Sequence, residues 1–291
     1  MRRAPYLFPI GARFGTDNLI LHANARRHRV EDFAGPLSVK TVLKGAVTWT
    51  VAGRELVVDP DSFLVLGDGE KYSMDLDEPR AVETACAFFR GGYVEEMARD
   101  ATTRVEEALD HPARQAPALP YLSRLHADPT RSILDQVQKM AARCGSEIQP
   151  SGFEEDFLLL SKNLLLLYEQ IRLQLERVPA VKARTREELF RRLQIGREYI
   201  HSHVDGAVSL EEVSRASCLS RYHFHRAFTQ TFQKTPHAYL TEVRLARAHS
   251  LLRSGAAVGE VCIAAGFSSA SSFSRLFRTQ FGVAPSAVRR S

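Results

Sequence analysis

A pattern of aromatic residues occurs twice in the last third of the chain, at a constant separation of 49 positions. The first copy is Phe224, Phe228, Phe232 and Pro236, and the second copy is Phe273, Phe277, Phe281 and Pro285. Residues four apart lie one above the other on a helix, so each triplet predicts one buried stripe of an amphipathic helix. Two such stripes in one register constrain this region to a duplicated helical unit.

The sequence also marks where these helices begin and what precedes them. Ser220 and Ser269 stand just before the two aromatic stripes, and serine is a favourable N-cap residue. A short amphipathic segment precedes each copy: "SLEEVSRAS", where Ser209 and Glu212 form a capping box, and "VGEVCIAAG", which ends at Gly266. A short helix, a tight turn and a second helix make a helix-turn-helix, and we expect this motif twice. The segment "PHAYLTEVRLARAHSLLRSG" predicts a long helix between the two motifs, and "REELFRRLQIGREYIHSHV" predicts a leading helix.

The outward face of each second helix carries residues suited to nucleic acid. If the phenylalanines point inward, the same four positions of each copy point outward: Tyr222, His225, Arg226 and Thr229, then Ser271, Ser274, Arg275 and Arg278. Arginine pairs bidentately with guanine edges, and small residues permit close approach to the bases in a major groove. A single arginine here could be an ordinary solvated charge. Arg226 and Arg275 in one register favour DNA contact, and we add Arg221 to the candidate DNA-binding residues.

Charge is distributed unevenly along the chain. From Lys182 onward there are 17 Lys and Arg against 8 Asp and Glu, whereas the preceding part has 22 against 26. A basic C-terminal third on a mildly acidic body is typical of a module that binds a polyanion, although a solvated basic surface has the same composition.

The N-terminal part predicts a small β-domain. Between residues 37 and 90, short stretches rich in Val, Thr and aromatic residues alternate with turn formers such as "AG", "DPD" and "GDGE". In "VTWTV", Val47, Trp49 and Val51 alternate with threonines, as in a strand buried on one face. Evenly spaced short strands predict a sandwich or small barrel. Trp49 is either a residue of an effector pocket or part of the core.

The middle of the chain predicts helices and a dimer contact. Two leucine-rich stripes run along residues 153–177: Phe157, Leu160, Leu164, Leu167 and Ile171, then Leu159, Leu166 and Leu173. A helix with two apolar stripes needs two surfaces to cover it. One surface is its own domain and the other is a second subunit, unless one chain buries both stripes. We assign dimerisation to Leu160, Leu164, Leu167 and Ile171, and expect a homodimer.

With these motifs in hand, the chain resembles the AraC/XylS family of transcription regulators. The resemblance covers residues 190–290 and rests on "LTEVRLARAHSLL" and "VGEVCIAAGFSSASSFSRLFRTQFGVAPSAVR". It implies two helix-turn-helix units joined by a helix, binding to promoter or operator DNA, and contact with RNA polymerase. The residues from "LKGAVTWTV" to "EKYSM" are similar to cupin-like sensor domains, which implies an effector-binding barrel. The chain departs from the family at Gln233, where glycine is usual, at Val288, where tyrosine is usual, and at Cys218.

Other activities lack their motifs. Residues 37–90 contain no histidine, so we expect no metal in the barrel, and the chain has no P-loop, Rossmann or G-x-S-x-G fingerprint. We therefore expect neither an enzyme nor a cofactor. The four cysteines are scattered, no apolar run reaches the length of a membrane span, and no signal peptide is expected, which predicts a cytoplasmic protein.

These expectations combine into one architecture. We predict an α+β protein with a cupin-like sensor domain at 1–93, a helical dimerisation region at 94–181 and an all-α DNA-binding domain at 182–291. Two alternatives to effector control stay open: a regulator controlled by a partner protein, and a cupin enzyme with a helical appendage. Activation and repression are equally compatible with the sequence.

Overall fold

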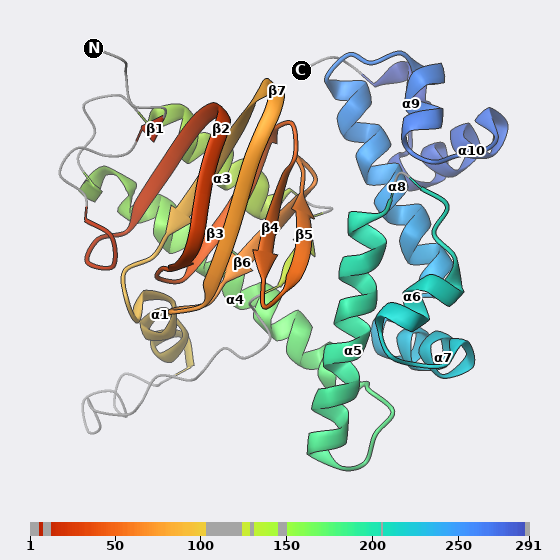
Figure 1. The fold of residues 1–291 in the computed structure, drawn as a ribbon, viewed down its shortest axis with the longest axis horizontal. Coiled ribbons are helices and arrows are strands. Elements are labelled where there is room, and N and C mark those ends of the chain that lie inside the picture. The colour runs from red at the N-terminus through yellow and green to blue at the C-terminus, as the bar shows by residue number, and fades with distance from the viewer. Residues whose placement is uncertain are drawn as a thin grey trace. The chain divides into compact units, whose positions relative to one another are not determined.

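The computed structural model describes residues 6–7, 13–102, 124–128, 131–144, 150–204 and 206–288. The chain divides into two compact units, Met1–Ile171 and Arg172–Ser291. Figure 1 shows the strands in the first unit and an all-helical second unit. The central helices, predicted as a region of their own over 94–181, belong to the first unit as far as residue 171.

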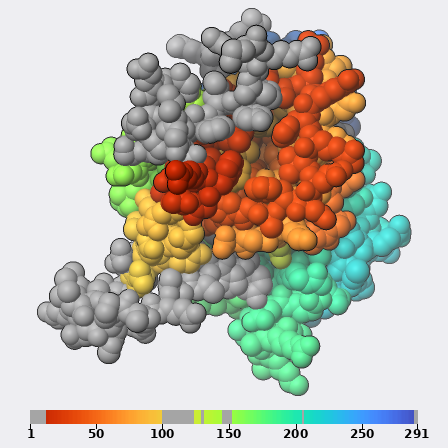
Figure 2. All heavy atoms as spheres, turned by 60° about the vertical axis from the view of Figure 1, so that its left-hand side comes forward, coloured from red at the N-terminus to blue at the C-terminus, as the bar shows by residue number. Residues whose placement is uncertain are grey.

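The first unit is built on one antiparallel sheet. Its strands are β1 (Tyr6–Leu7), β2 (Leu19–Ala34), β3 (Ser38–Lys44), β4 (Val47–Val51), β5 (Arg54–Val58), β6 (Ser62–Leu66), β7 (Lys71–Phe88) and β8 (Leu125–Ala127). They follow the order β1-β2-β7-β3-β6-β8, and β4 pairs with β5 and β7. The long β7 pairs along one part with β3 and along another with β4, so the sheet curls into a nearly closed barrel. Figure 2 shows these strands, in red and orange, covering one face of the unit.

The predicted strands between residues 37 and 90 are confirmed, and a strand that precedes them was missed. Strand β2 pairs with β7 from Leu19 opposite Phe88 to Ala34 opposite Lys71. Its second half, around "ARRHRV", is mostly exposed. A polar run of this kind reads as a loop in sequence, and only the pairing with β7 makes it a strand.

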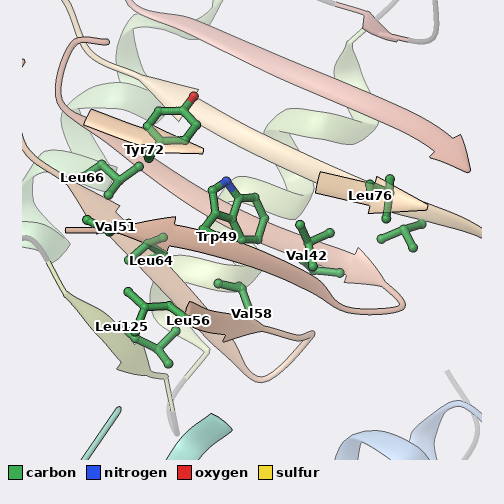
Figure 3. Close-up of a cluster of buried hydrophobic side chains, with 12 residues drawn as sticks. Val42, Trp49, Val51, Leu56, Val58, Leu64, Leu66, Tyr72, Leu76 and Leu125 are labelled. Carbon is green, nitrogen blue, oxygen red and sulfur yellow. The ribbon is translucent and has the colours of Figure 1, made fainter. Parts of the chain in front are cut away.

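The interior of the barrel is apolar. The alternation in "VTWTV" is confirmed, because Val47, Trp49 and Val51 are buried while the threonines between them are partly exposed. Trp49 packs in a cluster with Leu64, Leu66 and residues of neighbouring strands (Figure 3). Burying side chains of this size is worth about 1.5–3 kcal/mol each, so this cluster contributes to the stability of the first unit.

Three helices of the first unit are α1 (Tyr93–Thr102), α3 (Ser132–Arg143) and α4 (Glu154–Glu176), and a short 3-10 turn, η1 (Pro150–Phe153), precedes α4. Asp128 fixes the start of α3, because its carboxylate accepts hydrogen bonds from the backbone N–H groups of Ile133 at 2.8 Å and Leu134 at 2.9 Å. At the start of α4, Phe157 packs edge-to-face on Phe89, just after β7.

The two leucine stripes of α4 have different surroundings. Leu160 and Leu164 have no exposed surface and Ile171 is 2% exposed, so they are core residues, and Leu167 is partly buried. A side chain without exposed surface cannot reach a second subunit, which corrects the assignment of dimerisation to Leu160, Leu164 and Ile171. The other stripe, Leu159, Leu166 and Leu173, is exposed by 46%, 64% and 45%.

The second unit contains the predicted duplicated helices. They are α5 (Ala183–Ser202), α6 (Leu210–Ala216), α7 (Arg221–Phe232), α8 (Pro236–Arg253), α9 (Val258–Ala264) and α10 (Ala270–Phe281), followed by the 3-10 turn η2 (Pro285–Ala287). Helices α6 and α7 form the first helix-turn-helix, α9 and α10 form the second, and α8 joins them (Figure 1). Pro236 opens α8 at its first position, where a missing N–H costs nothing, and Thr235 caps it.

Candidate nucleic-acid interface and effector cavity

The second helices of the two motifs, α7 and α10, repeat each other in the structure as they do in sequence. Both are 12 residues long and their starts are 49 positions apart. The predicted N-caps are present: the hydroxyls of Ser220 and Ser269 accept hydrogen bonds from the backbone N–H groups three residues on. Phe224, Phe228, Phe273 and Phe277 have no exposed surface. The buried stripe therefore fixes which side of each helix faces outward.

The turns before α7 and α10 have the same backbone conformation with different residues. Cys218 has φ +53° and Gly266 has φ +76°, both in the left-handed region. In the first turn, the backbone N–H groups of Cys218 and Leu219 donate hydrogen bonds to the carbonyls of Arg215 and Ser214. In the second turn, the N–H groups of Gly266 and Phe267 bond to carbonyls of the preceding helix in the same way. This Schellman arrangement satisfies carbonyls at the helix end and reverses the chain sharply.

Sequence reasoning missed the residues that hold the first motif on its scaffold. Arg197 of α5 donates to the Tyr239 hydroxyl at 3.3 Å and lies over the rings of Phe232 and Tyr239. Gly196 lets α5 approach α7, because a Cβ there would lie 2.5 Å from the Phe224 ring. A conspicuous glycine inside "RRLQIGREY" was the available signal for this close packing.

All eight predicted DNA-binding residues lie on the exposed surface of the second unit: Arg221, Tyr222, His225, Arg226, Ser271, Ser274, Arg275 and Arg278. Tyr222 is 76% exposed, unusual for so large a ring. Within the described part of the chain, Arg226, Arg275 and Arg278 have no carboxylate within ion-pairing distance, whereas Arg221 lies 4.0 Å from Glu211. Unpaired guanidinium groups on one helix face can form bidentate bonds with phosphates or guanine edges.

The α10 face adds a shallow hollow to this surface. Ser274, Arg275, Arg278 and Thr279 line one side, and the residues around Pro285 line the other. Two guanidinium groups and several hydroxyls around one hollow give it the chemistry of an anion site, suited to a DNA phosphate.

A separate cavity of about 300 Å³ lies inside the barrel of the first unit. The structure places Trp49 in its wall, together with Tyr72 and Phe88, so the ring belongs both to the core and to the cavity lining. Sequence reasoning missed Lys40, whose ammonium reaches this cavity from β3 although the residue is 1% exposed. Burial lowers the pKa of Lys40 to about 8. At neutral pH the side chain is thus still mostly protonated.

Among the described residues, no three His, Cys, Asp or Glu side chains come together as a metal site would require. Within the same residues, no helix combines the length and the apolar character that crossing a bilayer demands. Cys86, Cys144, Cys218 and Cys262 are free thiols.

Two helix-turn-helix motifs joined by a helix, with cationic outward faces, define a DNA-binding domain. A family model described as a helix-turn-helix domain matches residues 213–291. The transcriptional activator RhaS of Escherichia coli strain K12 is 29% identical over 164 residues, which are 55% of each chain, and RhaS of strain SE11 matches to the same extent. The chain thus spans about half the length of the curated relatives it matches. The comparisons thus place a helix-turn-helix domain in the last quarter of the chain and show a partial likeness to a transcriptional activator.

Solved structures give partial likenesses. A probable AraC family regulator from Rhodopseudomonas palustris CGA009 is 29% identical, with a TM-score of 0.33, over 34% of this chain and 94% of that one. Apo ToxT from Vibrio cholerae is 11% identical, with a TM-score of 0.38, over 94% of this chain and 97% of that one.

Proposed function

We propose that this chain is a sequence-specific DNA-binding transcription regulator controlled by a small molecule that binds in the barrel. The observation that carries the DNA-binding part is the duplicated outward face, with Arg226 and Arg275 in one register and, among the described residues, no carboxylate within ion-pairing distance of either. The role is binding rather than catalysis, and such a regulator acts in the cytoplasm, where it meets DNA and RNA polymerase.

The two recognition helices offer DNA different chemistry. Helix α7 presents Tyr222, His225 and Arg226, whereas α10 presents serines at the first two of these positions and then Arg275. Serine reaches bases or phosphates with one short hydroxyl, so α10 can make fewer base contacts than α7. The hollow beside Arg275 and Arg278 suits a phosphate. We infer that the second motif reads fewer bases and binds the DNA backbone more strongly.

The test is Arg275→Ala on a duplex selected from a random library by the wild-type protein. Losing one bidentate base contact should weaken specific binding by about 1–3 kcal/mol and relax the preference at one base pair. The measurement is a titration against the selected duplex and against single-base variants, at several salt concentrations.

Arg184→Ala is the matched control, because Arg184 is an exposed arginine at the start of α5, off both recognition helices. It should retain the sequence preference. If Arg275→Ala weakens binding to every sequence equally, Arg275 contacts phosphate only. If both variants retain wild-type affinity, the proposed DNA interface is wrong.

We also propose that two copies of the chain pair through the exposed stripe of α4. Leu159, Leu166 and Leu173 repeat every seven residues, which puts them in one row along the helix. In an antiparallel pair centred on Leu166, Leu159 of one copy lies opposite Leu173 of the other. Lys162 lies four residues before Leu166 and Glu169 lies three after it, so the same symmetry brings Lys162 beside Glu169 of the second copy, twice. Apolar contact in the middle and opposite charges at its edge support this pairing.

The cavity supports control by a small molecule rather than by a partner protein. It is a partly open cavity lined by side chains of the barrel, and it lies at the lower end of the size range for ligand sites. An effector that binds one arrangement of the DNA-binding units better than another would shift the population toward it. In this scheme the effector cavity is in the first unit and the DNA-binding surface is in the second unit of the same chain.

A further inference from the structure

The barrel cavity is apolar with one charged exception. Its wall comes from β2, β3, β4 and β7, and the aromatic rings of Trp49, Tyr72 and Phe88 contribute with Met74 and Leu76. Among the residues that the structure describes, the titratable side chains in the lining apart from Lys40 are His28, Tyr72 and Cys86, and no carboxylate is among them. A cavity of this composition favours a mainly apolar occupant.

Lys40 occupies a position that is costly for a cation. Its Nζ donates a hydrogen bond to the Tyr72 hydroxyl at 3.1 Å and lies 3.7 Å from the centre of the Phe88 ring and 4.7 Å from that of Tyr72. These contacts stabilise the ammonium partly, but an ammonium has three donors and gains most from an anion.

The neighbouring groups do not supply that anion. Cys86 lies directly opposite Lys40 across the β3–β7 pairing. Burial raises the pKa of the Cys86 thiol and of the Tyr72 hydroxyl above their ordinary values. Both groups are therefore neutral at physiological pH, and an imidazole such as that of His28 does not supply a negative charge. The described part of the wall thus holds a positive charge beside open space, and none of its side chains supplies a negative charge.

We propose that the cavity binds a small, mainly apolar molecule carrying one carboxylate, and that Lys40 receives that carboxylate. This inference rests on the proposed sensing function and names the class of effector. The Tyr72 hydroxyl accepts its hydrogen bond from Lys40 and donates its own proton to a carboxylate oxygen. Trp49 and the other rings cover the hydrocarbon part. The lining residues that the structure describes all lie between Phe14 and Phe88, in the first unit.

Other ligand chemistries fit this wall less well. A sugar would bury several hydroxyls against rings and aliphatic side chains that offer them no partner. A phosphate ester would bring two negative charges to one ammonium. An apolar molecule without a charge would fill the space but leave Lys40 unpaired.

The experiment compares three probes of one shape: 4-phenylbutyrate, 4-phenyl-1-butanol and 4-phenylbutylamine. Their binding to the full chain is measured by titration calorimetry and by the fluorescence of Trp49, the single tryptophan of the chain. We expect the acid to bind at least tenfold more tightly than the alcohol, and the amine to show no binding. The three probes differ only in the head group, which is negative, neutral or positive, so the order of their affinities reports on the charge of the site.

Lys40→Met should abolish the preference for the acid while leaving alcohol binding unchanged or stronger. Lys44→Met is the matched control, because Lys44 is exposed at the end of the same strand, and it should behave as wild type. Tyr72→Phe removes only the hydroxyl, and it should weaken binding of the acid several-fold without affecting binding of the alcohol. This variant keeps the test valid if Lys40→Met fails to fold, which circular dichroism would reveal.

Three outcomes would overturn the inference: equal binding of acid and alcohol, retention of the acid preference in Lys40→Met, or binding of the amine. Two further outcomes distinguish a failure of this inference from a failure of the proposed function. If the acid binds through Lys40 and leaves affinity for DNA unchanged, the carboxylate site stands and the sensing role of the barrel fails. If only the alcohol binds and it changes DNA affinity, sensing stands and the ligand class is wrong.

Discussion

At the scale of single residues, the duplicated motif shows how one backbone conformation is filled by different side chains. Gln233 ends α7 with φ +57°, and Gly282 ends α10 with φ +73°. Glycine adopts this left-handed conformation at no steric cost, whereas other L-residues pay about 1–2 kcal/mol for it. The departure from the family at Gln233 is thus a local strain in the first motif, and it leaves the outward residues untouched.

We therefore expect Gln233→Gly to raise the free energy of unfolding by about 1 kcal/mol and Gly282→Ala to lower it by about the same amount. A Cβ at Gly282 meets no atom within 4 Å, so the expected loss of stability comes from the positive φ and not from a steric clash. The measurement is urea unfolding followed by far-UV circular dichroism.

Gly259→Ala serves as the control for this pair, because Gly259 lies inside α9, has no positive φ and also faces open space. It should raise the free energy of unfolding by roughly 0.5–1 kcal/mol through helix propensity. Should Gly282→Ala raise stability as Gly259→Ala does, the strain argument for Gln233 fails with it.

At the scale of elements, α4 combines two functions on opposite sides. One stripe packs into the first unit, and the other presents leucines to solvent, which a soluble chain avoids unless something covers them. Lys162 and Glu169 lie beside the exposed stripe and are both exposed. Their spacing about Leu166 is what makes an antiparallel pair electrostatically favourable and a parallel one unfavourable.

A charge swap tests this pairing. Lys162→Glu and Glu169→Lys should each weaken the dimer, because each puts like charges beside each other across the pair, and the double variant should restore it. Exposed pairs of this kind contribute about 0.2–1 kcal/mol each, and two symmetric pairs give a shift of several-fold in the dimer dissociation constant. Sedimentation equilibrium measures that constant.

Lys139→Glu, an exposed lysine of α3, is the control and should leave the dimer unchanged. Two results would refute the antiparallel pairing: no recovery in the double variant, or a dimer that tolerates Leu166→Glu.

At the scale of the whole molecule, the chain is two compact units with separate cores. The barrel cluster around Trp49 belongs to the first unit, and the cluster around Phe273 and Phe277 belongs to the second. Multi-domain chains depart from two-state unfolding because each core melts by itself. Trp49 reports on the first unit alone, whereas the helical signal comes largely from the second.

We expect two unfolding transitions that respond to different substitutions. Gly282→Ala should shift the circular-dichroism transition and leave the Trp49 fluorescence transition in place. Lys40→Met should do the reverse and raise the fluorescence midpoint, because it removes a buried charge. If either substitution moves both transitions together, the units unfold as one cooperative body.

Local sequence determined the helical unit almost completely. The 49-residue register, the serine caps and the capping box at Ser209 specify where helices start and which face is buried, because caps and periodicity act within one or two turns. The outward position of Arg226 and Arg275 follows from the phenylalanines alone. The alternation at Trp49 predicted its burial in the same way.

Tertiary structure decided what depends on partners distant in the chain. Strand β2 exists because β7 pairs with it, and the choice between the two stripes of α4 depends on which one the barrel covers. Nothing in "SVKTVLKG" distinguishes Lys40 from Lys44, yet one is buried beside Tyr72 and the other is exposed. The sequence by itself thus determined the DNA-reading helices. Only the closing of the sheet placed a lone cation inside an apolar cavity, because burial arises from elements meeting in space and not from neighbours along the chain.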